Sequence, residues 1–434
     1  MIERGFVEVN NRRVHWRAAG SGPVVVLLHE SPRSSTSLLP LLSHLSQHFC
    51  CIAFDTPGYG ASQPLPDGKD SLNDFAKVLR DAINALGLQD FGLYGTHTGA
   101  AIALELAELM PQRVTALLLD GLAMFSAEEQ QSFFQHYLIC HEPQWDGSHL
   151  NQIWSRILDQ TTFFPFYSRT PSTRLERPNA DLNFMLRTCI GFLESGNAYQ
   201  VGYRAAIAFD PKPVLSRIDI PCRIHAKEHD LLASHLKRAS SLPTRVTLCA
   251  EPLPQDDWLK ATKAWLSEFP ARTDSATRLP QHHNRRFIAT LAGPVFVARG
   301  SGKGLRIRDL DSIARPAGLY GIEDYNADAG WLADAPTHGV NASVNYDPKQ
   351  LAKALGAEIV NERVTTASPT LPPADALGGF LTSAWFAARR ELTLIKGDHA
   401  SCSNVVDEES ELAALVSGHL ALLYSHLNRV PWII

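Results

Sequence analysis

Short apolar segments and helical stretches alternate along the first 270 residues of the chain. The segments 6–9 and 14–18 predict a starting hairpin. The segments that follow are continuous apolar runs, typical of strands covered on both faces of a sheet, and they span 24–29, 51–55, 91–95, 114–120, 222–226 and 246–249. Helical periods lie between or after them, at 36–45, 71–86, 98–110 and 256–268. This order predicts an α/β fold with a mostly parallel sheet, and Ser71 has the position of a helix N-cap.

Two regions interrupt this alternation. Residues 122–212 are helical and rich in aromatic side chains. We expect them to form a cap whose rings line an apolar pocket or, alternatively, only the core of the cap itself. Residues 271–286 are polar, lack a regular period and contain a proline, which favours an interdomain linker. The predicted domains are therefore 1–270 and 287–434.

The region 287–434 predicts a C-terminal α+β domain. Short strands are expected at 287–291, 295–298 and 305–308, and helices at 348–355, 374–389 and 410–425. The leucines of the last helix are numerous enough to bury a core of their own. We expect a separately packed unit that closes the pocket of the first domain or builds a homodimer interface, and no motif indicates its role.

Composition and charge exclude several classes of protein. Apolar residues make up 45% of the chain and charged residues 20%, as in ordinary globular proteins. The net charge is −5, from 40 Lys and Arg against 45 Asp and Glu, which leaves no basic surface for nucleic acid or an anionic membrane. No apolar run approaches the roughly 20 residues of a membrane-spanning helix, and no apolar signal segment begins the chain. We therefore expect a soluble, cytoplasmic protein that acts on a small-molecule substrate.

The cysteines and histidines indicate no metal site. The 7 Cys and 17 His contain no CxxC or HExxH spacing, and Cys50 and Cys51 are adjacent within a predicted strand. We expect buried, free thiols in a reducing compartment, and neither a metal nor another cofactor.

The clearest chemical signal is the segment Gly95-Thr96-His97-Thr98-Gly99, which stands between a predicted strand and a predicted helix. Its G-x-X-x-G layout is that of a nucleophile elbow, in which two glycines permit a strained turn. Such a turn lifts the central side chain above the sheet and places it at a helix N-terminus. The central residue in this chain is His97.

Three further segments follow predicted strands in a matching order. His29-Glu30-Ser31-Pro32 ends the third strand, 55–62 follows the fourth, and Asp230 comes just after 222–226. Together with the elbow, these segments resemble the α/β-hydrolase family, in the branch that contains epoxide hydrolases, haloalkane dehalogenases and proline iminopeptidases. The resemblance spans residues 5–270 and implies an α/β-hydrolase fold with a helical cap insertion.

The site residues that the resemblance implies are present only in part. The acid is Asp230, with Asp120 at the alternative position after the sixth strand. The nucleophile, normally Ser, Asp or Cys, is replaced by His97. Glu30 stands where the oxyanion loop usually has Gly, and the histidine expected within 251–257 is missing. A Ser-His-Asp acyl transfer is therefore not available.

Two hypotheses remain for His97. In the first it is a general base, because imidazole titrates near pH 6.5 when unperturbed and a helix N-terminus favours its neutral form. Asp230 or Glu30 would orient the ring, and the backbone N–H groups of Ser31 and Thr98 would stabilise an oxyanion or enolate. The protein would then be a hydrolase or a cofactor-independent lyase acting on a small, mostly apolar carbonyl or ester compound. In the second hypothesis the elbow is a relic, and the protein binds ligands or serves as a scaffold without catalysis.

One segment of the second domain resembles the strand and histidine that the first domain lacks. Residues 391–397 predict a strand that ends in Asp398-His399 before a helix, as the last strand of the hydrolase template does. His399 would complete the site only if it lay near His97, and we expect it to lie far from the elbow. We expect Asp55 to stabilise the loop that follows it.

Overall fold

The structure, a computed structural model, describes most of the first 275 residues and four strands beyond them. The described residues are 2–10, 12–141, 148–176, 178, 181–240, 242–272, 274–275, 285–290, 293–299, 305–309 and 331–335. The chain divides into two compact units. The first comprises Met1–Cys140, Asp159–Ala180 and Gly191–Gln281, and the second comprises His141–Leu158, Asp181–Ile190 and His282–Ile434.

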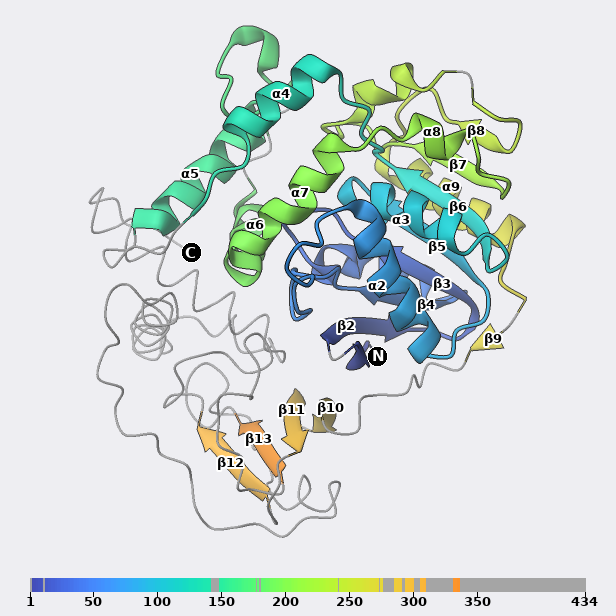
Figure 1. Cartoon of the computed structure of the whole chain (residues 1–434), viewed down its shortest axis with the longest axis vertical. Helices are drawn as coiled ribbons and strands as arrows, with labels where there is room; N and C mark the ends of the chain where they lie inside the picture. Colours follow the sequence, from blue (N-terminus) through green and yellow to red (C-terminus); the bar gives the residue numbers. More distant parts are fainter. Residues whose placement is uncertain are drawn as a thin grey trace. The chain divides into compact units, whose positions relative to one another are not determined.

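A mostly parallel sheet forms the centre of the first unit (Figure 1). Its strands are β1 (Glu3–Val9), β2 (Arg12–Ala19), β3 (Gly22–Leu28), β4 (Cys50–Phe54), β5 (Phe91–Thr96), β6 (Val114–Asp120), β7 (Cys222–His225) and β8 (Val246–Leu248). They lie in the order β1-β2-β4-β3-β5-β6-β7-β8, and a short strand β9 (Asp274–Ser275) pairs with β3. The pairs β1–β2 and β2–β4 are antiparallel, and the pairs from β4 to β8 are parallel. The predicted α/β fold is confirmed.

Helices cover both faces of this sheet. On one face lie α1 (Leu39–Leu45), which follows a 3₁₀ turn at Ser35–Leu38, and α9 (Gln255–Glu268). On the other lie α2 (Leu72–Ala85), α3 (Thr98–Leu109) and the short α8 (Lys212–Leu215). Ser71 caps α2 as expected: its hydroxyl accepts from the Asp74 N–H, and the Asp74 carboxylate accepts from the Ser71 N–H.

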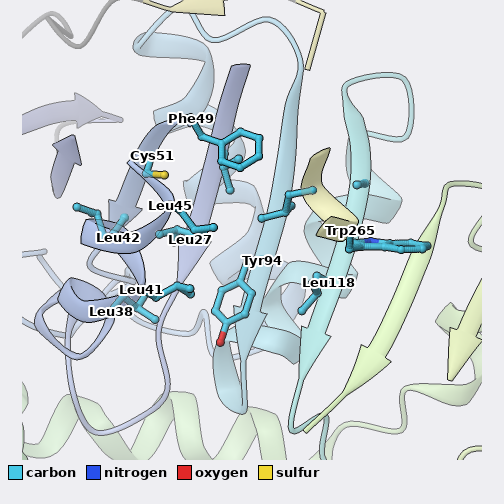
Figure 2. Packing of buried hydrophobic residues seen from close by; sticks show 14 of the residues in the cluster. Leu27, Leu38, Leu41, Leu42, Leu45, Phe49, Cys51, Tyr94, Leu118 and Trp265 are labelled. Atoms are coloured by element: carbon cyan, nitrogen blue, oxygen red, sulfur yellow. The ribbon is translucent and has the colours of Figure 1, made fainter. Parts of the chain in front are cut away.

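Figure 2 shows the apolar core beneath α1 and α9. Side chains alternate along a strand, so Val25 and Leu27 of β3 point into this core while Val26 and Leu28 point to the opposite face. All four are buried, which explains why β3 is a continuous apolar run. The helices contribute leucines and two tryptophans, namely Leu38, Leu41, Leu42, Leu45, Trp258 and Trp265.

The described residues of the segment 122–212 are mostly helical. Its helices are α4 (Ala127–His136), α5 (Ser148–Thr162), α6 (Leu182–Ser195) and α7 (Tyr199–Ala208). Within the first unit, α7 packs against α2, α3 and α4. A buried cluster connects α4 with α7. It consists of Phe133, Tyr137, Phe166 and Ile207, and further aromatic rings pack against it. Many aromatic side chains of the insertion therefore form a core of their own.

The described part of residues 282–434 is a sheet of short strands. These are β10 (Arg285–Thr290), β11 (Gly293–Arg299), β12 (Leu305–Asp309) and β13 (Trp331–Ala335), in the order β10-β11-β13-β12. The first three lie where strands are expected, and β13 was not predicted. The expected helices at 348–355, 374–389 and 410–425, most of the linker 271–286, and His399 lie outside the described residues.

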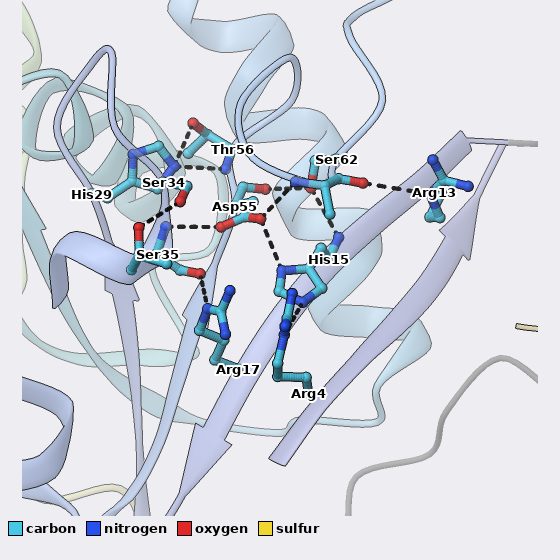
Figure 3. Close-up of polar contacts among 12 residues, drawn as sticks. Arg4, Arg13, His15, Arg17, His29, Ser34, Ser35, Asp55, Thr56 and Ser62 are labelled. Atoms are coloured by element: carbon cyan, nitrogen blue, oxygen red, sulfur yellow. Dashed lines mark hydrogen bonds and ion pairs between the residues drawn. The ribbon is translucent and has the colours of Figure 1, made fainter. Parts of the chain in front are cut away.

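A buried carboxylate, Asp55, joins three segments of the first unit (Figure 3). Its Oδ1 accepts from the backbone N–H of Ser35 at 2.8 Å, and its Oδ2 accepts from the backbone N–H of Ala61 at 2.9 Å and from Nδ1 of His15 at 2.8 Å. Burial lowers the pKa of His15 to about 4, so the neutral ring donates through Nδ1 and accepts from Arg4 at Nε2. Asp55 thus stabilises the loop that follows it and also holds the loop after β3.

We expect Asp55→Ala to destabilise the protein by about 3–5 kcal/mol, because the substitution leaves three buried N–H donors without their shared acceptor. Urea unfolding of the full chain measures this loss. Burial raises the pKa of Asp55, but the contact with His15 and the nearby Arg17 guanidinium hold it well below its usual value. Its contribution is therefore present above the unfolded pKa near 3.9 and decreases as the pH falls below it.

Asp67→Ala is the matched control for this experiment, because Asp67 is exposed in the loop between β4 and α2. Its free energy of unfolding should stay within about 0.5 kcal/mol of the wild-type value. Equal effects of the two substitutions would contradict the role assigned to Asp55.

Candidate active site

Residues 95–99 fold into the strained turn that their two glycines predict. His97 lies between β5 and α3 with φ +49° and ψ −113°. A Cβ at Gly95 would lie 2.2 Å from the carbonyl oxygen of Gly99, and a Cβ at Gly99 would lie 2.4 Å from that of Leu28. Only glycine fits at either position. The turn places His97 directly before the first residue of α3.

The imidazole of His97 is hydrogen-bonded to Asp230, which lies in the loop after β7. Nε2 is 2.8 Å from Oδ2 and 3.0 Å from Oδ1 of this carboxylate. Oδ1 also accepts from the backbone N–H of Leu232, which fixes the carboxylate. Gly121 leaves room for the ring, because a Cβ there would lie 2.6 Å from His97 Cδ2. About a quarter of the His97 side chain (26%) is exposed, against 10% for Asp230, so the ring is accessible to a ligand.

This pairing reverses the expected charge of His97. Burial lowers the pKa of the imidazole, but the Asp230 carboxylate outweighs burial and raises this pKa to about 9. Conversely, burial raises the pKa of Asp230, but His97 beside it holds that pKa below its usual value. Near pH 7 the carboxylate therefore favours the protonated ring over the neutral ring expected from the helix N-terminus, because a charged hydrogen bond is worth more than the helix dipole.

The loop after β3 holds Glu30 away from this contact. Its carboxylate is 3.0 Å from Arg33 and accepts from the Ser37 hydroxyl at 2.9 Å. Burial raises the pKa of Glu30, but Arg33 outweighs burial and lowers it to about 2. His29 closes the loop by donating to the Glu30 carbonyl and accepting from the Thr56 N–H. The orienting contact to His97 is therefore made by Asp230 and not by Glu30.

Ser31 and Thr98, the expected oxyanion donors, flank the elbow. Gly99 of α3 packs against the carbonyl oxygens of Leu28 and His29, which brings the two segments together. Within the described part of the chain, the backbone N–H groups of Ser31 and Thr98 have no hydrogen-bond acceptor. They are therefore available to a ligand oxygen.

The carboxylate of Asp120, the alternative acid, contacts Tyr94 and Lys227 rather than the ring of His97. Its Oδ2 accepts from the Tyr94 hydroxyl at 2.6 Å and lies 4.0 Å from the Lys227 ammonium. Its backbone carbonyl accepts from the His97 N–H at 2.9 Å. Burial raises the pKa of the Asp120 carboxyl to about 6. Asp120 therefore holds the backbone of the elbow, whereas Asp230 contacts the side chain of His97.

The position of the family's histidine is filled by a proline-rich loop. Leu253 exchanges backbone hydrogen bonds with Ala226 and Glu228 just past β7, and α9 begins at Gln255. His399 lies outside the described residues, so its distance from His97 stays a prediction. In the described ranges, no cluster of His, Cys, Asp and Glu is arranged to hold a metal, and no helix is long and apolar enough to cross a bilayer.

Sequence reasoning missed Tyr59 and Gly121, which shape the site. Tyr59 and Tyr203 hold Ser31: the Ser31 hydroxyl donates to Tyr59 Oη at 2.7 Å, and Tyr203 Oη donates to the Ser31 carbonyl at 2.8 Å. Gly121 could have been noticed, because it directly follows a strand end beside the alternative acid. The contact of Tyr59 with Ser31 carries no local signal, since the two residues are 28 positions apart in the sequence.

Residues 23–194 match the family model described as the alpha/beta hydrolase fold. Among curated proteins, an uncharacterized protein of Mycobacterium tuberculosis is 32% identical over 114 residues, 26% of this chain and 33% of its own length. A haloalkane dehalogenase of Mesorhizobium japonicum is 37% identical over 100 residues, 23% of this chain and 32% of its own length. The chain thus spans about a third of the length of these relatives. The resemblance to the α/β-hydrolase family is confirmed.

Some solved structures are also similar to part of this chain. An epoxide hydrolase from Vigna radiata has 16% identity and a TM-score of 0.47, and the match covers 62% of this chain and 98% of that one. A laboratory-evolved variant of potato epoxide hydrolase has 17% identity and a TM-score of 0.49, covering 62% and 100%.

The His97 imidazole should titrate near pH 9 in an NMR titration of the histidine ring signals. Asp230→Asn removes the carboxylate that raises this pKa, so the transition should move below pH 6.5, where burial dominates. Glu228→Gln, an exposed change two residues away in the same loop, should leave the transition in place. A wild-type protein in which no histidine titrates above pH 8 would contradict the ion pair.

Proposed function

We propose that this chain, which contains an α/β-hydrolase domain, is an enzyme whose reacting group is the His97–Asp230 pair. The observation that carries the proposal is the hydrogen-bonded pair itself, on a strained turn that holds a partly exposed ring. Nδ1, the nitrogen of His97 not held by Asp230, has no hydrogen-bond partner among the described residues. This nitrogen is therefore the atom that a substrate would meet.

The charge of the pair favours one role for this nitrogen. With a pKa of about 9, His97 is protonated at neutral pH, so Nδ1 donates a hydrogen bond. We infer that it stabilises negative charge on a carbonyl oxygen as a bond at the carbonyl carbon breaks or forms, together with the N–H groups of Ser31 and Thr98. The substrate class that fits is a small carbonyl or ester compound, consumed by a hydrolase or a lyase. A haloalkane dehalogenase among the relatives supports an enzymatic role.

A second candidate function is ligand binding without catalysis. It is favoured by residues 251–257, which contain no histidine where the family's catalytic histidine is expected. The two functions differ in whether His97 is needed for turnover or only for affinity.

Purified full-length protein should first be assayed against esters, lactones, epoxides and β-diketones. On any compound that is turned over, His97→Ala and Asp230→Asn should each lower kcat by about 10²–10⁴-fold, the usual contribution of a proton-donating or proton-accepting side chain. His48→Ala, at an exposed histidine, is the matched control and should be fully active. Full activity of His97→Ala would contradict the catalytic role, and tight binding without turnover in the wild type would support the second candidate.

The pH dependence of kcat/KM tests the protonation state that the proposal requires. Since the protonated ring is the active form, activity should be level up to about pH 9 and should fall about tenfold per pH unit above it. Asp230→Asn should move this fall to lower pH, because the carboxylate no longer holds the proton. A rate that instead rises tenfold per unit up to pH 9 would assign His97 the role of general base.

A further inference from the structure

A cavity of about 440 Å³ lies in the first unit, beside the segment that carries Asp230. Its volume is in the range of small-molecule sites, about 300–1,000 Å³. Aromatic rings from the helical insertion form one side, and residues of the loop after β7 form the other. The aromatic lining consists of Phe125, Phe133, Phe164 and Tyr167. Leu231, which also lines the cavity, directly follows Asp230 in the chain.

His235 brings a hydrogen-bond donor to this lining. Its Nδ1 accepts from the backbone N–H of Met124 at 2.8 Å, and its side chain is only 4% exposed. Burial lowers its pKa to about 4, so the ring is neutral near pH 7 and carries its proton on Nε2. Among the described residues this N–H has no acceptor. This N–H belongs to a residue that lines the cavity, so it can donate to an oxygen of a ligand there.

The charges around the cavity favour an uncharged ligand. Arg238 is bound to the Glu129 carboxylate through both of its terminal nitrogens, one of them at 2.8 Å, and one also donates to the Met124 carbonyl. Its positive charge is therefore already compensated. Glu128 is exposed at the rim and would repel an anion.

We propose that this cavity binds a neutral aromatic carbonyl compound, with its ring against the phenylalanines and its oxygen on Nε2–H of His235. The aromatic lining favours a flat ring beyond the gain from buried area, because ring edges and faces attract one another. The inference goes beyond the proposed function, because His97, Ser31 and Thr98 do not line this cavity: the compound is held next to the loop that positions Asp230 and does not touch the reacting pair. Binding can be measured without turnover, so the two proposals fail separately.

Ligand-detected NMR on the full chain tests the site with three probes: acetophenone, ethylbenzene and benzoate. Acetophenone should bind tightest. Ethylbenzene, which has the ring but no oxygen, should bind about fivefold more weakly, the ratio that corresponds to one neutral hydrogen bond. Benzoate should bind more weakly than acetophenone. Equal affinities for acetophenone and ethylbenzene, a tighter benzoate, or no acetophenone binding at millimolar concentration would each overturn the proposal.

Variants then locate the site. His235→Asn removes the Nε2–H donor while its amide oxygen can still accept from Met124, so acetophenone should fall to the affinity of ethylbenzene, which itself stays unchanged. Phe164→Ala should weaken both probes about tenfold. Phe134→Ala is the matched control, because Phe134 packs on the same aromatic cluster but does not line the cavity. Equal losses for the two phenylalanine variants would place the ligand elsewhere and overturn the proposal.

Discussion

The close approach of α3 to β5 and to the loop after β3 is the constraint on which the candidate site depends. No Cβ fits at Gly95 or Gly99, and the chain between them turns so tightly that His97 takes a positive φ. Such a conformation costs a non-glycine residue on the order of 1 kcal/mol or more. Hydrogen bonds from the His97 N–H to Asp120 and from Ala100 to the His97 carbonyl hold the turn in place. The backbone, rather than the side chain, therefore decides the direction in which the imidazole leaves the elbow.

The direction of the His97 side chain changes the chemistry available at the elbow. In a triad, the elbow residue attacks, and a separate histidine links it to the acid. Here one side chain stands at the elbow and contacts the acid Asp230 directly, so no group lies between them. A helix N-terminus disfavours an imidazolium by about 0.3–1 kcal/mol, whereas hydrogen bonds to charged groups are worth about 1.5–3 kcal/mol. The carboxylate therefore favours the protonated ring, which is the state that the proposed proton-donor role of His97 requires.

Sequence patterns predicted the structural features that depend on residues close together along the chain. The buried run at 24–29, the cap at Ser71 and the turn around His97 follow from side-chain periodicity, hydrogen bonding over three residues and glycine sterics. The choice between Asp230 and Glu30 as partner of His97 depends on distances across the fold, and periodicity carries no such information. Only the pairing of Glu30 with Arg33, three residues on, had a local signal. The five residues of strand β13, WLADA, form only a weak apolar pattern. This strand is therefore specified by its neighbours in the sheet.

The helical insertion is tied to the site by hydrogen bonds as well as by packing. Tyr203 of α7 donates to the Ser31 carbonyl, and Tyr59 Oη donates to the backbone carbonyl of Tyr199 at the start of the same helix. Gly202 permits this contact, because a Cβ there would lie 2.2 Å from Tyr59 Oη. A displacement of α7 would break both bonds and release the segment that carries a candidate oxyanion donor. The geometry around His97 therefore depends on the insertion even though the His97–Asp230 pair is built wholly from the sheet and its loops.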